Sequence, residues 1–154
     1  MMDDRSAGPI QHAYPENFQV CLGCGRLNDN GYHVESYWLG DEAVCTFHPQ
    51  PHHTAFPGFV YGGLIASLID CHACATASAA EGERTGNSDP LPRFMTGTLN
   101  VVYLKPTPID SPLELRARAV EFKGRKVTVA VELHAAGELR AKGEVIAFRI
   151  ESGA

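Results

Sequence analysis

The chain has no excess of basic residues. Its 154 residues include 13 lysines and arginines against 18 aspartates and glutamates, which leaves a formal net charge of -5. Nucleic-acid binding depends on a positive surface that neutralises phosphates. We therefore expect no nucleic-acid partner.

The sequence also lacks a basic leader and a strongly apolar run. Acidic residues stand at the N-terminus where a secretory signal carries positive charge. The longest run of low polarity, Leu64 to Ala80, consists mostly of small residues and contains Asp70 and His72. This run is too polar for a typical membrane span. We therefore expect a cytoplasmic protein with no membrane partner.

Cysteine is scarce and odd in number. Five cysteines are scattered along the chain, which predicts free thiols and no disulfide framework. The pair Cys21 and Cys24 has the spacing of half a zinc site, and histidines elsewhere could complete it. No second close ligand pair follows at a zinc-finger spacing. The expectation is therefore no metal and no cofactor.

The composition that is present fits one folded domain, with 44% hydrophobic and 20% charged residues. Residues 1–30 are rich in Pro, Gly, Asn and Asp, which predicts an extended N-terminal segment lying outside the core. Residues 31–154 are expected to form the single domain.

The pattern of residues 31–154 predicts an α+β domain. Two strands, Tyr32 to Leu39 and Glu42 to His48, flank a Gly-Asp hairpin signal. A helix from the glycine pair to Ala80 follows, then a polar loop from Glu81 to Pro92 and four strands with alternating apolar residues. A sheet that curls around the helix would bury both, and pairing with an identical subunit would cover its edges.

Two details of the strand region carry further expectations. Gly124 and Gly137 stand where hairpin turns are predicted. The apolar alternation changes phase between Leu139 and Ile146, which predicts a bulge near Gly143.

The helix start is the strongest signal of chemistry. Gly62 and Gly63 precede the apolar helix, and a helix N-terminus offers unpaired N–H groups to a ligand oxygen. Asp70 interrupts the same helix, where an unpaired carboxylate would be costly. The seven residues between Gly63 and Asp70 span about 10 Å. The Gly63 N–H and the Asp70 carboxylate of one chain therefore cannot both contact the same carbonyl group. We expect the site to need a second chain.

The sequence resembles the hotdog-fold acyl-CoA thioesterases of the PaaI-like branch over roughly residues 18–150. The matching motifs are Cys21-Leu-Gly-Cys-Gly25, Phe56-Pro-Gly58, Tyr61-Gly-Gly63, Leu68-Ile-Asp70, Thr96 to Pro108 and Gly124-Arg-Lys126. The resemblance implies a curved antiparallel sheet wrapped around one long central helix. It also implies an acyl-CoA substrate and a homodimer or dimer of dimers.

The resemblance assigns roles to individual residues. The N–H of Gly63, with Gly62 beside it, would polarise the thioester carbonyl. Asp70 would act as base or nucleophile, and Thr96 would hold the water or the carboxylate. The family histidine before the glycine pair is Tyr61 in this chain, where it would shape the mouth of the site.

Three cations, Lys105, Arg125 and Lys126, fall next to predicted strand ends and are candidates for the phosphates of coenzyme A. Solvated turn charges are the alternative interpretation.

The leading prediction is an enzyme that hydrolyses a medium-chain, long-chain or aryl acyl-CoA. The alternative, motivated by Tyr61, is a non-catalytic acyl-CoA or fatty-acid binder on the same fold. A hydratase of this fold is a third hypothesis, disfavoured because no histidine stands at the helix mouth.

Overall fold

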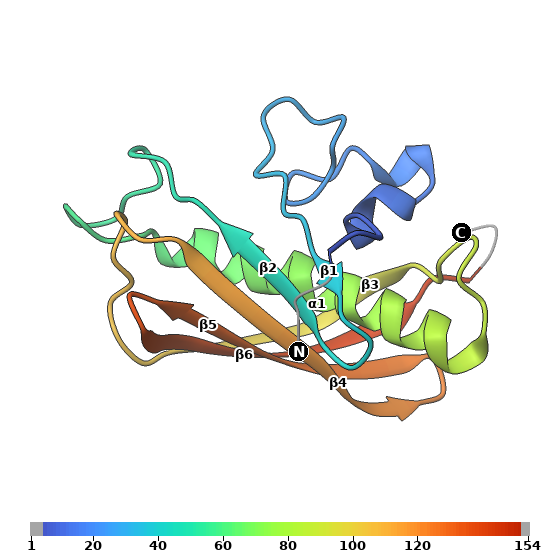
Figure 1. Cartoon of the computed structure of the whole chain (residues 1–154). Helices are drawn as coiled ribbons and strands as arrows, with labels where there is room; N and C mark the ends of the chain where they lie inside the picture. Colours follow the sequence, from blue (N-terminus) through green and yellow to red (C-terminus); the bar gives the residue numbers. More distant parts are fainter. Residues whose placement is uncertain (1–4, 152–154) are drawn as a thin grey trace.

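One long helix lies across the concave face of an antiparallel sheet (Figure 1). The computed structural model describes residues 5–151. Six strands form the sheet in the order β1-β2-β4-β5-β6-β3, and every neighbouring pair is antiparallel. This is the hotdog arrangement that the sequence predicted.

The strands fall in the predicted regions, but the first is much shorter than the predicted strand from Tyr32 to Leu39. The first hairpin joins β1 (Tyr37–Trp38) to β2 (Ala43–Phe47). The remaining strands are β3 (Phe94–Tyr103), β4 (Leu113–Lys123), β5 (Lys126–Ala135) and β6 (Glu138–Arg149). Gly124 and Gly137 occupy the two later turns with φ of 60° and 76°, a backbone region that L-residues with side chains rarely adopt.

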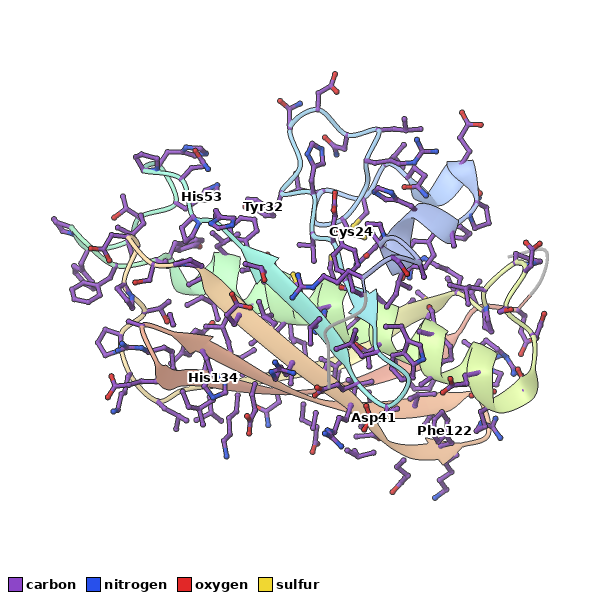
Figure 2. The ribbon with its side chains drawn as sticks, in the orientation of Figure 1. Cys24, Tyr32, Asp41, His53, Phe122 and His134 are labelled. Atoms are coloured by element: carbon purple, nitrogen blue, oxygen red, sulfur yellow. The ribbon has the colours of Figure 1, made fainter. Side chains whose placement is uncertain are left out.

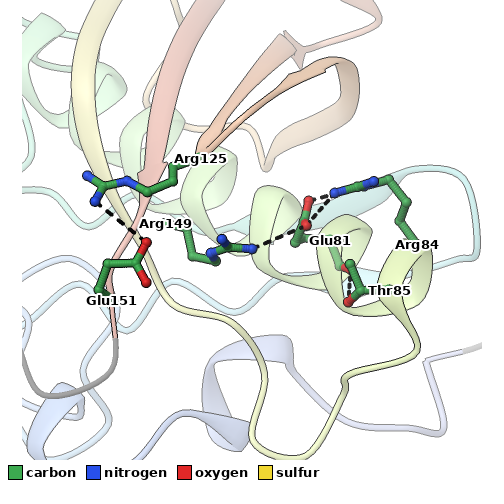
Figure 3. Close-up of polar contacts among 6 residues, drawn as sticks. All are labelled: Glu81, Arg84, Thr85, Arg125, Arg149 and Glu151. Carbon is green, nitrogen blue, oxygen red and sulfur yellow. Dashed lines mark hydrogen bonds and ion pairs between the residues drawn. The ribbon is translucent and has the colours of Figure 1, made fainter.

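The helix α1 (Gly62–Thr85) is longer than the sequence predicted, because residues 81–85 continue it instead of starting a loop. Buried Glu81 forms ion pairs with Arg84 at 2.5 Å and with Arg149 of β6 at 3.7 Å (Figure 3). These pairs stabilise a polar last turn, and Gly86 ends the helix in the left-handed conformation.

The predicted apolar stripe of α1 faces the core, with Leu64, Ile65, Leu68 and Ile69 at most 2% exposed. By length and hydropathy α1 could cross a membrane, but 72% of its most apolar window is buried within the fold. It is therefore the core helix of the domain.

The predicted bulge near Gly143 is wrong. Gly143 pairs regularly with Val131 and Val101, and the shift between β5 and β6 falls between Leu133 and His134. The face of β6 that packs on the helix carries small residues, because a Cβ at Gly143 would lie 2.4 Å from Ile69 Cγ2. The short distance between the helix and β6 therefore requires small side chains on this face of the strand.

The N-terminal segment contributes to the core, contrary to expectation. It forms two short 3-10 helices, η1 (Ile10–Ala13) and η2 (Glu16–Phe18). Ile10 and Tyr14 are 6% and 5% exposed and belong to the main apolar cluster. The segment lies on the side of α1 away from the sheet (Figure 1), so part of the helix is covered on both sides.

Candidate functional site

The first turn of α1 is held in place by the loop that precedes it. The Tyr61 N–H donates to the His53 carbonyl at 2.9 Å, and short bridges pair Thr54 with Val60 and Phe59 with Pro108. Within residues 5–151, the N–H groups of Gly62 and Gly63 donate to no acceptor of the chain. They remain available to a ligand, as the first amides of a helix do.

Two tyrosines flank the glycine pair. The Tyr103 hydroxyl donates to the Gly62 carbonyl at 2.6 Å. A Cβ on Gly63 would lie only 2.5 Å from the Tyr61 ring, so the ring folds back over the glycine backbone. Burial, with a smaller contribution from Tyr61, raises the pKa of Tyr103. Tyr103 therefore acts as a neutral hydrogen-bond donor at the helix start.

A cavity of about 550 Å³ opens beside Gly62. Its walls are mainly apolar and include Phe56, Phe59, Ile65 and Leu104. Lys105 lies at this cavity, with its ammonium group 3.0 Å from the exposed carboxylate of Glu138. The cavity can accept an apolar chain while one cation stays within reach of a polar head group.

Asp70 lies two turns further along α1 and is only partly buried. The Thr96 hydroxyl of β3 donates a short hydrogen bond to Asp70 Oδ1. The register of β3 against β6 shifts between Thr96 and Thr98, so Gly97 is an extra residue at this point. Bulges re-aim neighbouring side chains, and this one accompanies the turn of Thr96 toward the helix.

Cys74 extends the contact between Thr96 and Asp70. Its sulfur lies 3.4 Å from the Thr96 hydroxyl oxygen. Burial raises the pKa of Cys74 to about 11, which keeps the thiol protonated near neutral pH. The thiol can therefore donate to Thr96 while Thr96 donates to Asp70. Such a chain leaves Asp70 Oδ2 free to face a substrate.

His72 lies in the interior, as the sequence predicted for its default role, and takes no part in this arrangement. Its Nε2 donates to the Ala43 carbonyl at 3.1 Å, and its Nδ1 accepts from the Ser36 hydroxyl at 2.7 Å. Burial lowers the pKa of His72 to about 4. A neutral, fully bonded imidazole here is structural.

Within one chain, the three candidate cations do not lie close together. Lys105 lies beside the helix start, whereas Arg125 pairs with Glu151 at 3.5 Å near the helix end (Figure 3). The Lys126 ammonium lies over the Phe148 ring at 5.4 Å from its centroid. Within one subunit, Arg125 and Lys126 are therefore remote from Gly62 and Gly63.

Sequence reasoning assigned no role to Tyr103 or to the Thr96 contact of Cys74. Tyr103 stood in the motif from Thr96 to Pro108, so its position was visible but its partner was not. Cys74 is four residues after Asp70 and hence on the same helix face. That spacing was the available signal for a thiol near the carboxylate.

Comparison with known proteins identifies the family of this arrangement. The thioesterase superfamily matches residues 57–142. A thioesterase superfamily protein from Shewanella loihica is 46% identical, with a TM-score of 0.66 over 78% of this chain and 93% of that protein. The PaaI protein of E. coli, 13% identical over 78% of this chain and 81% of that one, shares the fold with a TM-score of 0.65.

Two acyl-coenzyme A thioesterases match this chain over less than half of their own length. The acyl-coenzyme A thioesterase THEM4 of Rattus norvegicus is 33% identical over 95 residues, which are 62% of this chain and 36% of that protein. The Mus musculus protein of the same name is 31% identical over 108 residues, or 70% of this chain and 42% of that protein. The matched part of the chain thus spans 36% and 42% of these two relatives.

Proposed function

The chain belongs to the thioesterase superfamily, and from this premise we propose that it hydrolyses acyl-CoA thioesters at a site shared by two subunits. The observation that carries the proposal is the hydrogen bond from Thr96 that orients the Asp70 carboxylate. Asp70 belongs to the same helix whose first N–H groups, those of Gly62 and Gly63, have no acceptor among the described residues. The names of the THEM4 relatives support coenzyme A as the carrier.

In this mechanism the Gly63 N–H, with Gly62 beside it, donates to the carbonyl oxygen of the thioester. Asp70 of the other subunit activates a water molecule or attacks the carbonyl carbon itself. In the water route, Asp70 Oδ2 takes the proton as the new C–O bond forms, and the N–H holds the oxyanion. The C–S bond then breaks, and the thiolate of coenzyme A leaves and is protonated.

Two subunits are required because of helix geometry. Gly63 and Asp70 lie about 10 Å apart along one axis, too far to act on the same carbon. An antiparallel second α1 would bring its Asp70 to the first helix start. The free edge of β3 supports such pairing, because Met95, Leu99 and Val102 of this edge strand are 57%, 39% and 52% exposed. Long apolar edges are normally covered.

The cavity beside Gly62 favours an apolar acyl group, either a medium or long chain or an aryl group. Tyr103 lines this cavity beside Gly62, and the Tyr61 ring lies against Gly63. In this proposal Lys105, which lines the cavity, binds a phosphate of coenzyme A. Arg125 and Lys126 reach this site only if another subunit brings them there.

The test compares Asp70→Asn and Thr96→Ala with the parent chain on acyl-CoAs of increasing chain length, following release of free thiol. We expect kcat/KM to fall by about 10²- to 10⁴-fold for Asp70→Asn and by a smaller factor for Thr96→Ala. Asp41→Asn, an exposed carboxylate in the first hairpin, is the matched control and should retain activity. Equal activity in all four proteins would exclude this site.

The folded-back Tyr61 ring favours a second candidate, a binder without turnover. A carbon atom of the ring lies 2.5 Å from the position that a Cβ on Gly63 would take, next to the amide that the mechanism needs. If the chain holds acyl-CoA by calorimetry and releases no thiol from any member of the series, the binder is the correct function. Recovery of turnover in Tyr61→His would then identify the ring as the block.

A further inference from the structure

Three cysteines from two separate segments meet on the side of α1 that faces the N-terminal segment. Cys21 and Cys24 come from the loop before β1, and Cys71 comes from α1. Their sulfur atoms all lie within 4.8 Å of one another, and Cys21 and Cys71 are separated by 3.9 Å. Figure 2 shows Cys24 where the loop approaches the helix.

The loop is shaped to bring these sulfurs together. The Gly25 N–H donates to the Cys21 carbonyl at 2.8 Å, closing a tight turn. A Cβ on Gly25 would lie 2.4 Å from Cys21 N, and one on Gly23 would lie 2.2 Å from Cys71 Sγ. Only glycine fits at either position without a shift.

The separations match those of metal ligands. A disulfide would bring two sulfurs to about 2.05 Å. Two thiolates on one tetrahedral zinc, each at about 2.3 Å from the ion, are about 3.8 Å apart. The 3.9 Å between Cys21 and Cys71 is close to the second value. A small movement of Cys24 would complete the set.

We propose that Cys21, Cys24 and Cys71 bind one thiophilic metal ion, Zn²⁺ or Cu⁺, that fastens the N-terminal loop to the central helix. Both ions favour thiolate ligands, and the Cys-x-x-Cys spacing is common in zinc sites. Three thiolates complete a trigonal shell for Cu⁺. For Zn²⁺ they leave a fourth position, which partly exposed Cys21 leaves accessible to water or a small anion.

This site was discounted at the sequence level because no second ligand pair follows Cys24. The third ligand comes instead from the helix, directly after Asp70. The ion would join two segments that are distant in sequence. Its binding free energy would therefore add to the stability of the folded chain.

The experiment uses the full chain and the variants Cys21→Ser, Cys24→Ser and Cys71→Ser. Cys45→Ala is the matched control, since Cys45 is a buried thiol of β2 outside the cluster. Zinc is measured by competition with a chromogenic chelator, and Cu⁺ by competition with a Cu⁺ chelator under argon. Co²⁺ is added as a spectroscopic probe of thiolate ligation.

We expect one ion per chain in the parent and in Cys45→Ala, with a thiolate charge-transfer band for Co²⁺. Each cluster variant should bind at least about tenfold more weakly. The melting temperature should rise with the ion in the parent and in Cys45→Ala only. The tighter of the two ions identifies the metal.

A second measurement needs no variant. In the parent chain, bound metal should protect Cys21 from alkylation by iodoacetamide, as read by mass spectrometry. Unchanged alkylation of Cys21 in the presence of both ions would overturn the proposal. So would equal metal affinity of the parent chain and all three cluster variants.

Discussion

At the scale of single residues, the Asp70 carboxylate is oriented by one hydroxyl and the glycine pair by two phenols. Thr96 fixes one oxygen of Asp70, and Tyr103 fixes the Gly62 carbonyl. Partial burial on a helix strengthens such hydrogen bonds while leaving the second carboxylate oxygen accessible. The chemistry of the site therefore depends on neighbours that no local sequence pattern pairs with it.

The buried His72 gives a prediction about pH. Its pKa is about 4 in the folded chain and about 6.5 when unfolded, so the unfolded chain takes up a proton first as pH falls. Stability is full above pH 6.5 and is lost as pH falls toward 4, by on the order of 3 kcal/mol from this group. Denaturant unfolding between pH 7 and pH 4.5 should show the loss.

The control for this prediction is His134→Gln, a partly exposed histidine of β5, which should keep the parent's pH slope. His72→Gln should be less stable at pH 7 and show a shallower slope. A parent slope that persists unchanged in His72→Gln would assign the pH dependence to other groups.

At the scale of elements, the bulge in β3 links the sheet to the site. Gly97 is the extra residue, and a Cβ there would lie 2.1 Å from Phe148 Cε2 of β6. The strand can bend at this point because glycine leaves space for the ring. The bend accompanies the Thr96 hydroxyl's approach to Asp70.

Gly97→Ala should therefore lower the free energy of unfolding by about 1–3 kcal/mol through overpacking. It should also lower thioesterase activity, because Thr96 moves with the strand. Phe148→Ala removes the ring, so the double variant should recover part of the loss due to Gly97→Ala. Denaturant unfolding of the four proteins measures the coupling; strictly additive effects would refute the proposed clash.

At the scale of the whole molecule, the proposed mechanism requires a second subunit, and the chain has a free apolar edge at β3. The helix start and Asp70 lie on one helix about 10 Å apart. The exposed edge strand β3 pairs with β6 and itself packs against this helix. Pairing through this edge would cover apolar surface and complete the site at once.

Val102→Glu on this edge should convert a dimer into a monomer and abolish turnover, because charge at the edge opposes pairing. Val120→Glu is a close match, since Val120 of β4 is 58% exposed against 52% for Val102. The control should keep both assembly and activity. Sedimentation and thiol release measure the two properties; a fully active monomer would contradict the shared site.

Local pattern in the sequence determined the central helix, the strand alternation, the turns at Gly124 and Gly137 and the candidate residues of the helix start. These follow from periodicity and from backbone conformations that glycine favours, which act within a few residues. The end of the helix was missed because Glu81 depends on Arg149, a residue of the last strand.

Tertiary structure alone decided which distant groups meet. It placed Thr96 against Asp70, put a bulge at Gly97, buried Ile10 and Tyr14 and brought Cys71 to the Cys21 loop. Each of these contacts joins segments far apart along the chain. Their partners are selected by close packing of the helix between the sheet and the N-terminal segment, and a linear pattern carries no record of that packing.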